Sequence, residues 1–273
     1  MIEYPWINKP PLGVPLDESN LLTRDMEAYY AFNEYAGGEA KDLSGNGNNG
    51  QWNGTGTHWA GGVAQFASAT SDYLDAGTDP SVEFGTSDFT FLAEIKPDAV
   101  ADGSKAGIVS TLGVAAAGYI FAYRASGGNK LYIETYDGAQ NPNGFSTGVI
   151  TPNSWTQVAV VRGGGNYTFY INGTASGTVG DTAGNITNSN SLRIGGSVAN
   201  GSKVFDGRFR YVNMLSRALS RSEVVALTAN PWHLHVPLLV PFPVAAPVGV
   251  AFPILSGNDI HSAVFGRQII TGG

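Results

Sequence analysis

The chain has 273 residues, of which 42% are hydrophobic and only 14% are charged. This length and apolar content suit one large β domain with extensions and a sizeable core. The net charge of −7 argues against a nucleic-acid ligand, because a phosphate backbone is bound by a basic surface. Cysteine is absent, which excludes disulfides, cysteine–zinc sites and thiol nucleophiles.

The N-terminal residues do not have the pattern of a signal peptide. Met1 to Trp6 contain neither a basic stretch nor an apolar core segment, so we expect synthesis and assembly in a cytoplasm. Prolines at positions 5, 10, 11 and 15 disfavour regular structure in this region. Residues 1–27 are therefore predicted to be an extended N-terminal arm.

A loop rich in asparagine and glycine follows the first predicted strand. Asp42, Asn46 and Asn48 offer oxygen atoms of the kind that calcium prefers. The alternative is a turn in which the same side chains accept hydrogen bonds from the backbone. The turn is the favoured interpretation, and calcium remains open as the one cofactor.

Aromatic residues in and beyond this loop are candidates for sugar stacking. Trp52 and Trp59 lie in a stretch of glycine, asparagine and threonine, and Tyr73 follows it. Tyr119 and Tyr123 are instead assigned to the core, because they alternate on an apolar strand face.

The middle of the chain alternates apolar and polar residues with a period of two. In residues 89–96 the apolar side chains share one face, whereas Glu94 and Lys96 take the other and are expected to be solvated. Asn172-Gly173 is the strongest short hairpin signal, because a type I′ turn needs positive φ at both central residues. Many short strands with such turns predict an all-β, antiparallel two-sheet jelly-roll sandwich over residues 28–230.

One helix is predicted near the end of this domain. Ser220 and Glu223 have the spacing of a capping box, and Asn230-Pro231 ends the segment. The sandwich therefore carries one short C-terminal helix.

Residues 231–273 form a proline-rich apolar tail with two formal charges, Asp259 and Arg267. Its uncharged stretch is long enough for a membrane span, but the frequent prolines exclude a hydrogen-bonded helix, so no span is expected. Burying each large apolar side chain contributes roughly 1.5–3 kcal/mol, so the tail is expected to contact a neighbouring subunit. The alternative is a cover over a sheet of its own domain. The candidate assembly residues are Trp232, Leu238, Leu239, Phe242 and Phe252.

Several segments in this order resemble laminin-G-like domains of the concanavalin-A-like lectin/glucanase superfamily. They are Asp42-Leu43-Ser44-Gly45-Asn46-Gly47, Tyr73-Leu74, Phe89-Thr90-Phe91, Trp155-Thr156-Gln157-Val158-Ala159, Tyr170-Ile171-Asn172-Gly173, Leu192-Arg193-Ile194-Gly195 and Phe205-Asp206-Gly207. The resemblance implies a two-sheet jelly roll that often binds glycans or proteins and sometimes calcium.

The chain departs from this family at two places that matter for chemistry. The Glu-x-Asp-x-Glu strand of the family's glucanases is missing, so we expect no catalytic residues and no enzyme activity. The acids that relatives carry after Phe205-Asp206-Gly207 are replaced by Arg210 and Tyr211. Arg210 would repel a cation, and we expect it to pair with Asp42 instead. His233 and His235 alternate on one segment and offer half of a metal site.

A narrower resemblance concerns the segment from Leu227 to Trp232, which is similar to the exit of laminin-G-like proteins in tailed bacteriophages. It implies a non-enzymatic virion structural protein, a capsid decoration or tail-associated component located in the virion. The expected partners are copies of the chain in a trimer, a major capsid or tail protein, and a host-surface glycan. The alternative is an extracellular carbohydrate-binding module of a secreted or cell-surface protein.

Overall fold

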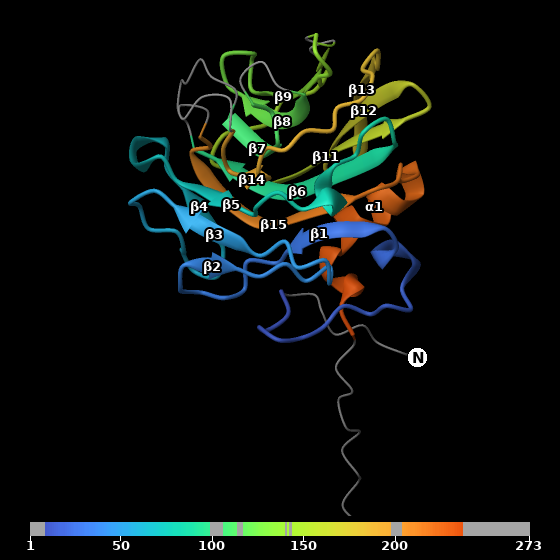
Figure 1. The fold of residues 1–273 in the computed structure, drawn as a ribbon. Helices are drawn as coiled ribbons and strands as arrows, with labels where there is room; N and C mark the ends of the chain where they lie inside the picture. The colour runs from blue at the N-terminus through green and yellow to red at the C-terminus, as the bar shows by residue number, and fades with distance from the viewer. Residues whose placement is uncertain are drawn as a thin grey trace, which may run out of the picture. The chain divides into compact units, whose positions relative to one another are not determined.

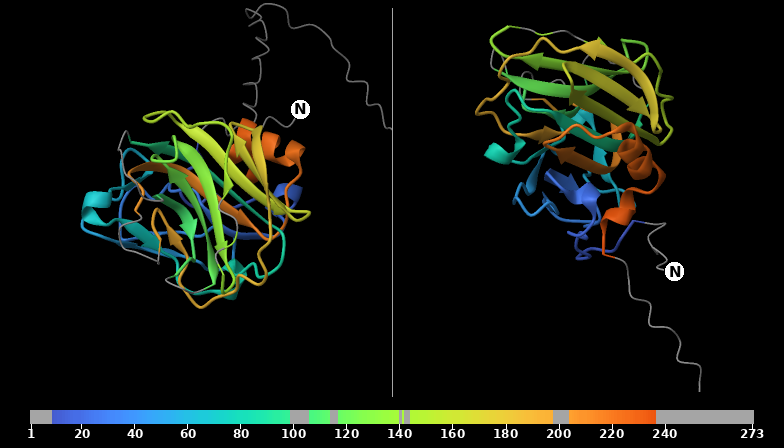
Figure 2. Two further views of the ribbon diagram at one scale, coloured as in Figure 1. Left: turned by 90° about the horizontal axis from the view of Figure 1, so that it is seen from above. Right: turned by 90° about the vertical axis from the view of Figure 1, so that its right-hand side faces the viewer.

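A computed structural model of the chain describes residues 9–98, 106–113, 117–139, 141, 144–197 and 204–236. These residues form two antiparallel β-sheets that pack face to face, with one α-helix near the C-terminal end of the described part (Figures 1 and 2). The predicted all-β sandwich with one short helix is confirmed.

The first sheet has seven strands among the described residues. Their order is β1-β15-β6-β11-β12-β13, and β4 pairs with β15 beside this path. The strands are β1 (Met26–Tyr30), β4 (Ala64–Phe66), β6 (Phe89–Pro97), β11 (Thr156–Gly163), β12 (Asn166–Ile171), β13 (Thr174–Gly180) and β15 (Gly207–Leu215).

The second sheet has eight described strands in the order β10-β9-β8-β7-β14-β5-β3-β2. They are β2 (Glu39–Ala40), β3 (Gly50–Asn53), β5 (Tyr73–Asp75), β7 (Ala106–Ser110), β8 (Gly118–Arg124), β9 (Lys130–Tyr136), β10 (Gly144–Phe145) and β14 (Arg193–Ile194). Short 3-10 turns connect or follow the strands at η1 (Leu21–Thr23), η2 (Ser68–Thr70), η3 (Pro80–Val82) and η4 (Pro231–Leu234).

Two local sequence signals have the predicted geometry. Asn172 and Gly173 have φ values of 48° and 73°, and they join β12 to β13 as a hairpin of the I′ kind. At α1 (Arg221–Ala229) the Ser220 side chain accepts a hydrogen bond from the Glu223 amide, and Glu223 accepts one from the Ser220 amide. The capping box is therefore confirmed.

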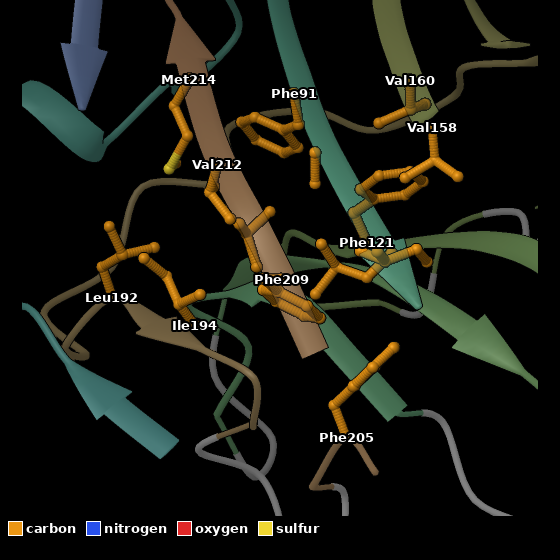
Figure 3. Packing of buried hydrophobic residues seen from close by; sticks show 14 of the residues in the cluster. Phe91, Phe121, Val158, Val160, Leu192, Ile194, Phe205, Phe209, Val212 and Met214 are labelled. Atoms are coloured by element: carbon orange, nitrogen blue, oxygen red, sulfur yellow. The ribbon is translucent and has the colours of Figure 1, made fainter. Parts of the chain in front are cut away.

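The main core lies between the two sheets. Phe91 of β6, Phe121 of β8 and Phe209 of β15 are completely or almost completely buried there, and Figure 3 shows them within one apolar cluster. Tyr119 and Tyr123 belong to the same cluster, which confirms their assignment to the core.

A second apolar cluster covers the outer face of the seven-stranded sheet. Leu92 and Tyr211 from the sheet pack with Leu227 of α1 and Trp232 of η4. Figure 1 shows α1 (orange) and β1 with the N-terminal segment (blue) on this side of the molecule. The prediction of a solvated Glu94 was therefore wrong: its side chain lies under this cover, and the residue is only 8% exposed.

The two ends of the described chain lie against each other. Leu16 and His235 form an isolated antiparallel bridge, and the Val236 amide donates to the Pro15 carbonyl at 3.1 Å. His235 is fully buried; its Nε2 lies 3.2 Å from the Tyr29 hydroxyl and its Nδ1 lies 3.2 Å from the Val14 carbonyl oxygen. Burial lowers the pKa of His235, so the neutral imidazole joins the N-terminal segment to the end of the domain.

Candidate functional site

The predicted calcium loop is a hydrogen-bonded turn. Both Asp42 carboxylate oxygens already accept hydrogen bonds: from the Tyr29 and Ser44 amides at 2.9 Å, from the Asn48 amide at 2.9 Å and from the Ser44 hydroxyl at 2.8 Å. The Asn46 side-chain amide donates to the Met26 and Glu27 carbonyl oxygens. Asp42 does not fit a cation, because both of its carboxylate oxygens are engaged by N–H and O–H donors that occupy the space where a metal would lie.

Arg210 is not the partner of Asp42, contrary to the sequence-based expectation. Its Nη1 lies 2.6 Å from Glu94 Oε1. The Asn48 side-chain amide donates outside the turn, to the Glu27 carbonyl oxygen of β1 and to the Ser81 hydroxyl of η3. No group of three potential metal-ligating side chains occurs among the residues that the structure describes, and both ring nitrogens of His235 are used by the contacts given above.

The aromatic residues predicted to bind sugar form a partly buried cluster. Trp52 stacks on His58 with 4.6 Å between ring centroids and lies edge-to-face with Trp59 at 5.5 Å. Trp59 Nε1 donates to the Gly37 carbonyl oxygen. Tyr73 lies on the neighbouring strand β5, where the Arg193 guanidinium covers its ring at 4.2 Å. The structure thus brings Trp52 and Trp59 together, and protein groups already contact a face of Trp52 and Tyr73.

The one predicted assembly residue in the described part of the chain is buried within the domain. Trp232 is 6% exposed and meets Tyr211 edge-to-face at 5.8 Å, so this side chain is a cover over its own sheet and not a free contact for a neighbour. This corrects the intersubunit prediction for Trp232. Leu238, Leu239, Phe242 and Phe252 lie outside the described residues.

An open cavity of about 440 Å³ lies at the edge of this covered face, and sequence reasoning missed it. We call it the Trp155 groove. A second cavity of about 270 Å³ shares Arg210 and Trp232 with it and adds Glu94 and Gln157. The groove is lined by Lys9, Tyr35, residues 60–63, Trp155, Arg208, Arg210 and Trp232.

A β-bulge places Arg210 and Tyr211 side by side on the outer face. In the pairing of β15 with β6, Phe209 faces Ile95 and Tyr211 faces Glu94, so the register shifts at Arg210. Phe209 points into the main core, whereas Tyr211 belongs to the outer cluster. Alternation from Phe209 alone puts Arg210 on the outer face, and the extra residue turns Tyr211 to the same face, which is the re-aiming that bulges produce.

The guanidinium of Arg210 is held by two contacts. Besides the ion pair with Glu94, it lies 4.3 Å from the centroid of the Trp155 ring, a cation–π arrangement. Burial raises the pKa of the Glu94 carboxyl, and Arg210 opposes this shift. The pair fixes the position of Arg210 and of the half-buried Trp155.

A glycine turn forms the opposite wall. Gly61 and Gly62 have φ values of 60° and 78°, and the Ala60 amide donates to the Val63 carbonyl oxygen. A Cβ on Gly62 would lie 2.7 Å from the Tyr35 ring. The turn thus needs glycine at position 62, because the backbone has a positive φ there and because a side chain would collide with Tyr35. Tyr35 is 63% exposed, and its ring lies over the turn.

Lys9 from the N-terminal segment also lines the groove. Its ammonium group donates to the Gly62 carbonyl oxygen at 2.8 Å and to the Phe32 carbonyl oxygen at 3.1 Å, and it lies 5.6 Å from the Trp232 ring centroid. Burial lowers the pKa of Lys9 to about 7. The N-terminal segment therefore contributes a titratable amine to a site made mostly by the sandwich.

Two signals in the sequence point to this site. In Phe209-Arg210-Tyr211-Val212 the alternation of apolar residues fails by one position, as a bulge requires. Ala60-Gly61-Gly62-Val63 has the pattern of a tight hairpin turn.

The two-sheet sandwich with a groove at its edge defines a lectin-like β-sandwich protein. A laminin-G-type family model, described as the Concanavalin A-like lectin/glucanases superfamily, matches residues 68–225. The chain belongs to this superfamily. No curated protein sequence matches it.

Solved structures with the same fold are distant in sequence. The binding domain of Paraclostridial Mosquitocidal Protein 1 has a TM-score of 0.59 at 19% identity, over 76% of this chain and 52% of that one. Domain 4 of a GH43 extracellular arabinanase from Geobacillus stearothermophilus, in complex with arabinotriose, has a TM-score of 0.56 at 17% identity, over 75% of this chain and 98% of that one. A botulinum neurotoxin type C structure has a TM-score of 0.56 at 11% identity, over 76% and 51%. This chain thus matches about half the length of the first and third of these.

No helix in the described part of the chain has the length and apolarity needed to cross a membrane.

Proposed function

We propose that this protein is a non-enzymatic carbohydrate-binding protein that holds a glycan in the Trp155 groove. The observation that carries this proposal is an open cavity whose lining includes the aromatic rings of Trp155 and Tyr35, besides Trp232, together with the N–H donors of Arg208 and Arg210. Aromatic rings supply apolar contact area for a sugar ring, and a few placed polar groups fix its orientation.

The absence of enzyme activity is part of the proposal. Glycoside hydrolysis uses two carboxyl groups on either side of the scissile bond. Among the described residues that line the two cavities, Glu94 is the one carboxylate, and Arg210 holds it in an ion pair. Two proteins of the same fold add support for glycan binding: the arabinanase domain was solved with arabinotriose, and cell entry of the type C neurotoxin depends on interaction with two ganglioside molecules.

Trp155→Ala is expected to weaken glycan binding at least tenfold, because loss of an aromatic anchor costs about 1.4 kcal/mol or more. A glycan array followed by titration calorimetry on the bound glycan measures this. Trp59→Ala is the matched control, because Trp59 lies in the other aromatic cluster and does not line the groove. Loss of binding in Trp59→Ala alone would place the sugar at Trp52 and Trp59, and a silent array would overturn the glycan-binding function.

A second candidate function is a structural role in a virion, and the arrangement of the chain ends favours it. The Val236–Pro15 hydrogen bond and the Leu16–His235 bridge bring the entry and exit of the domain to one place. Segments that leave a domain together are suited to hold neighbouring copies in a closed ring. In this proposal a trimer, assembled in the host cytoplasm, decorates a capsid or tail through a major capsid or tail protein. An extracellular location is the alternative.

The oligomeric state tests this role. We expect the full chain to have the molar mass of a trimer and a chain ending at residue 236 to be a monomer, both measured by size-exclusion chromatography with light scattering. A monomer in both cases would contradict the assembly role and would leave the glycan-binding proposal untouched.

A further inference from the structure

The Trp155 groove is a basic site on an acidic protein. The chain has a net charge of −7, yet the larger cavity is lined by Lys9, Arg208 and Arg210. No carboxylate is among its described lining residues. A concave site with one sign of charge concentrates ligands of the opposite sign, whatever the charge of the whole protein.

Arg210 and Arg208 differ in what holds them. The Arg210 guanidinium is paired with Glu94 and stacked on Trp155. The side chain of Arg208, on the same strand and the same face, makes one long contact, from Nε to Gln65 Oε1 at 3.4 Å. Among the residues that the structure describes, no carboxylate lies within ion-pair distance of Arg208.

A half-buried guanidinium without a counterion is costly, because burial removes water from the charge without a compensating partner. The planar fork of arginine matches a carboxylate in a bidentate manner. Arg208 lines the groove, and its terminal nitrogens have no hydrogen-bond partner among the described residues, so a ligand carboxylate would supply the missing counterion.

From this we infer that the Trp155 groove selects acidic sugars, with Arg208 binding the sugar carboxylate while Trp155 and Tyr35 contact its ring. This inference rests on the proposed glycan-binding function and names its ligand class. Arg210, which Glu94 neutralises, and Lys9 also line the groove, and the contacts of Lys9 with the Phe32 and Gly62 carbonyl oxygens keep it in place.

The test uses the full chain and an array of matched glycan pairs. Each oligosaccharide that contains a uronic or other carboxylated sugar is printed beside its carboxyl-reduced, neutral counterpart, and sulfated oligosaccharides form a third arm. We expect binding to carboxylated members, at least tenfold weaker binding to their reduced counterparts, and a weaker response to the sulfated arm.

Two variants separate the charge from the rest of the site. Arg208→Gln is expected to lose at least tenfold in affinity for the carboxylated glycan and to weaken binding of its neutral counterpart by a clearly smaller factor, so that the preference for the carboxylated member of each pair disappears. Arg208→Lys keeps the positive charge but lacks the planar guanidinium. Its affinity for the carboxylated glycan should therefore lie between those of Arg208→Gln and the unmodified chain. Arg193→Gln, which removes the guanidinium over Tyr73 instead, is the control. It should change neither the affinity for the carboxylated glycan nor that for its neutral counterpart. Unchanged melting temperatures show that the variants are folded.

The outcomes distinguish this inference from the function on which it rests. Equal binding of both members of each pair, unaffected by Arg208→Gln but lost in Trp155→Ala, would overturn the acidic-sugar inference and support the glycan site. Preference for sulfated glycans would overturn the carboxylate assignment. Binding that survives Trp155→Ala, or no binding on any arm, would overturn both.

Discussion

Arg162→Met is expected to lower the free energy of unfolding by about 4 kcal/mol, because it leaves a buried carboxylate without its partner. Arg162 Nε lies 2.6 Å from Asp181 Oδ2, and the two side chains are 5% and 8% exposed. The same guanidinium donates to the carbonyl oxygens of Gly85, Ser87 and Ala183. One side chain therefore ties the segment before β6 to the segment after β13, and urea denaturation measures its contribution.

The control for Arg162 is Arg221→Met on the exposed surface of α1, which is expected to change stability by less than about 0.5 kcal/mol. The double variant Arg162→Met/Asp181→Leu removes both charges and should recover part of the loss, since apolar groups often replace a buried pair with little net cost. Wild-type stability in Arg162→Met would contradict the structural role of the pair. A double variant less stable than the single one would contradict the assignment of the loss to an unpaired Asp181.

Asp42→Ala is expected to destabilise the domain by about 3 kcal/mol, because partly buried donors lose their acceptor and each one costs about 1–3 kcal/mol. The amides of Tyr29, Ser44 and Asn48 are those donors. They join β1 to the turn that leads to β2 and β3, so the variant loosens the start of the sandwich. Thermal and urea denaturation measure the effect.

The matched control for Asp42 is Asp79→Ala. The Asp79 carboxylate accepts a hydrogen bond from the Ser81 amide in an exposed turn, and its loss is expected to cost about 1 kcal/mol. Addition of calcium or of a chelator should leave the melting temperature of the unmodified chain unchanged, because the Asp42 oxygens already accept hydrogen bonds. A calcium-dependent rise in melting temperature that is lost in Asp42→Ala would show that this turn binds the ion.

Local patterns in the sequence do not predict which residues line the proposed site. Lys9, Tyr35, Trp155 and Arg208 come from four separate parts of the chain, and no spacing in the sequence relates them. Trp52 and Trp59 were selected instead, because aromatic residues in a polar loop suggest an exposed rim. The structure places Trp52 against His58 and Phe66, since the surrounding strands of the sheet bring buried groups to both rings.

Local patterns in the sequence were enough to predict the all-β sandwich, the Asn172-Gly173 hairpin and the capped helix α1, because these depend on alternation, on positive φ and on a contact between residues three apart. Long-range packing, in contrast, sets whether the outer face of the seven-stranded sheet is exposed or covered. The helix, Trp232 and the N-terminal segment cover it, so Glu94 is buried and needs Arg210. Whether the outer face of a sheet is buried depends on which distant segment of the chain packs on it. The alternation of apolar and polar residues within one strand carries no information about that segment.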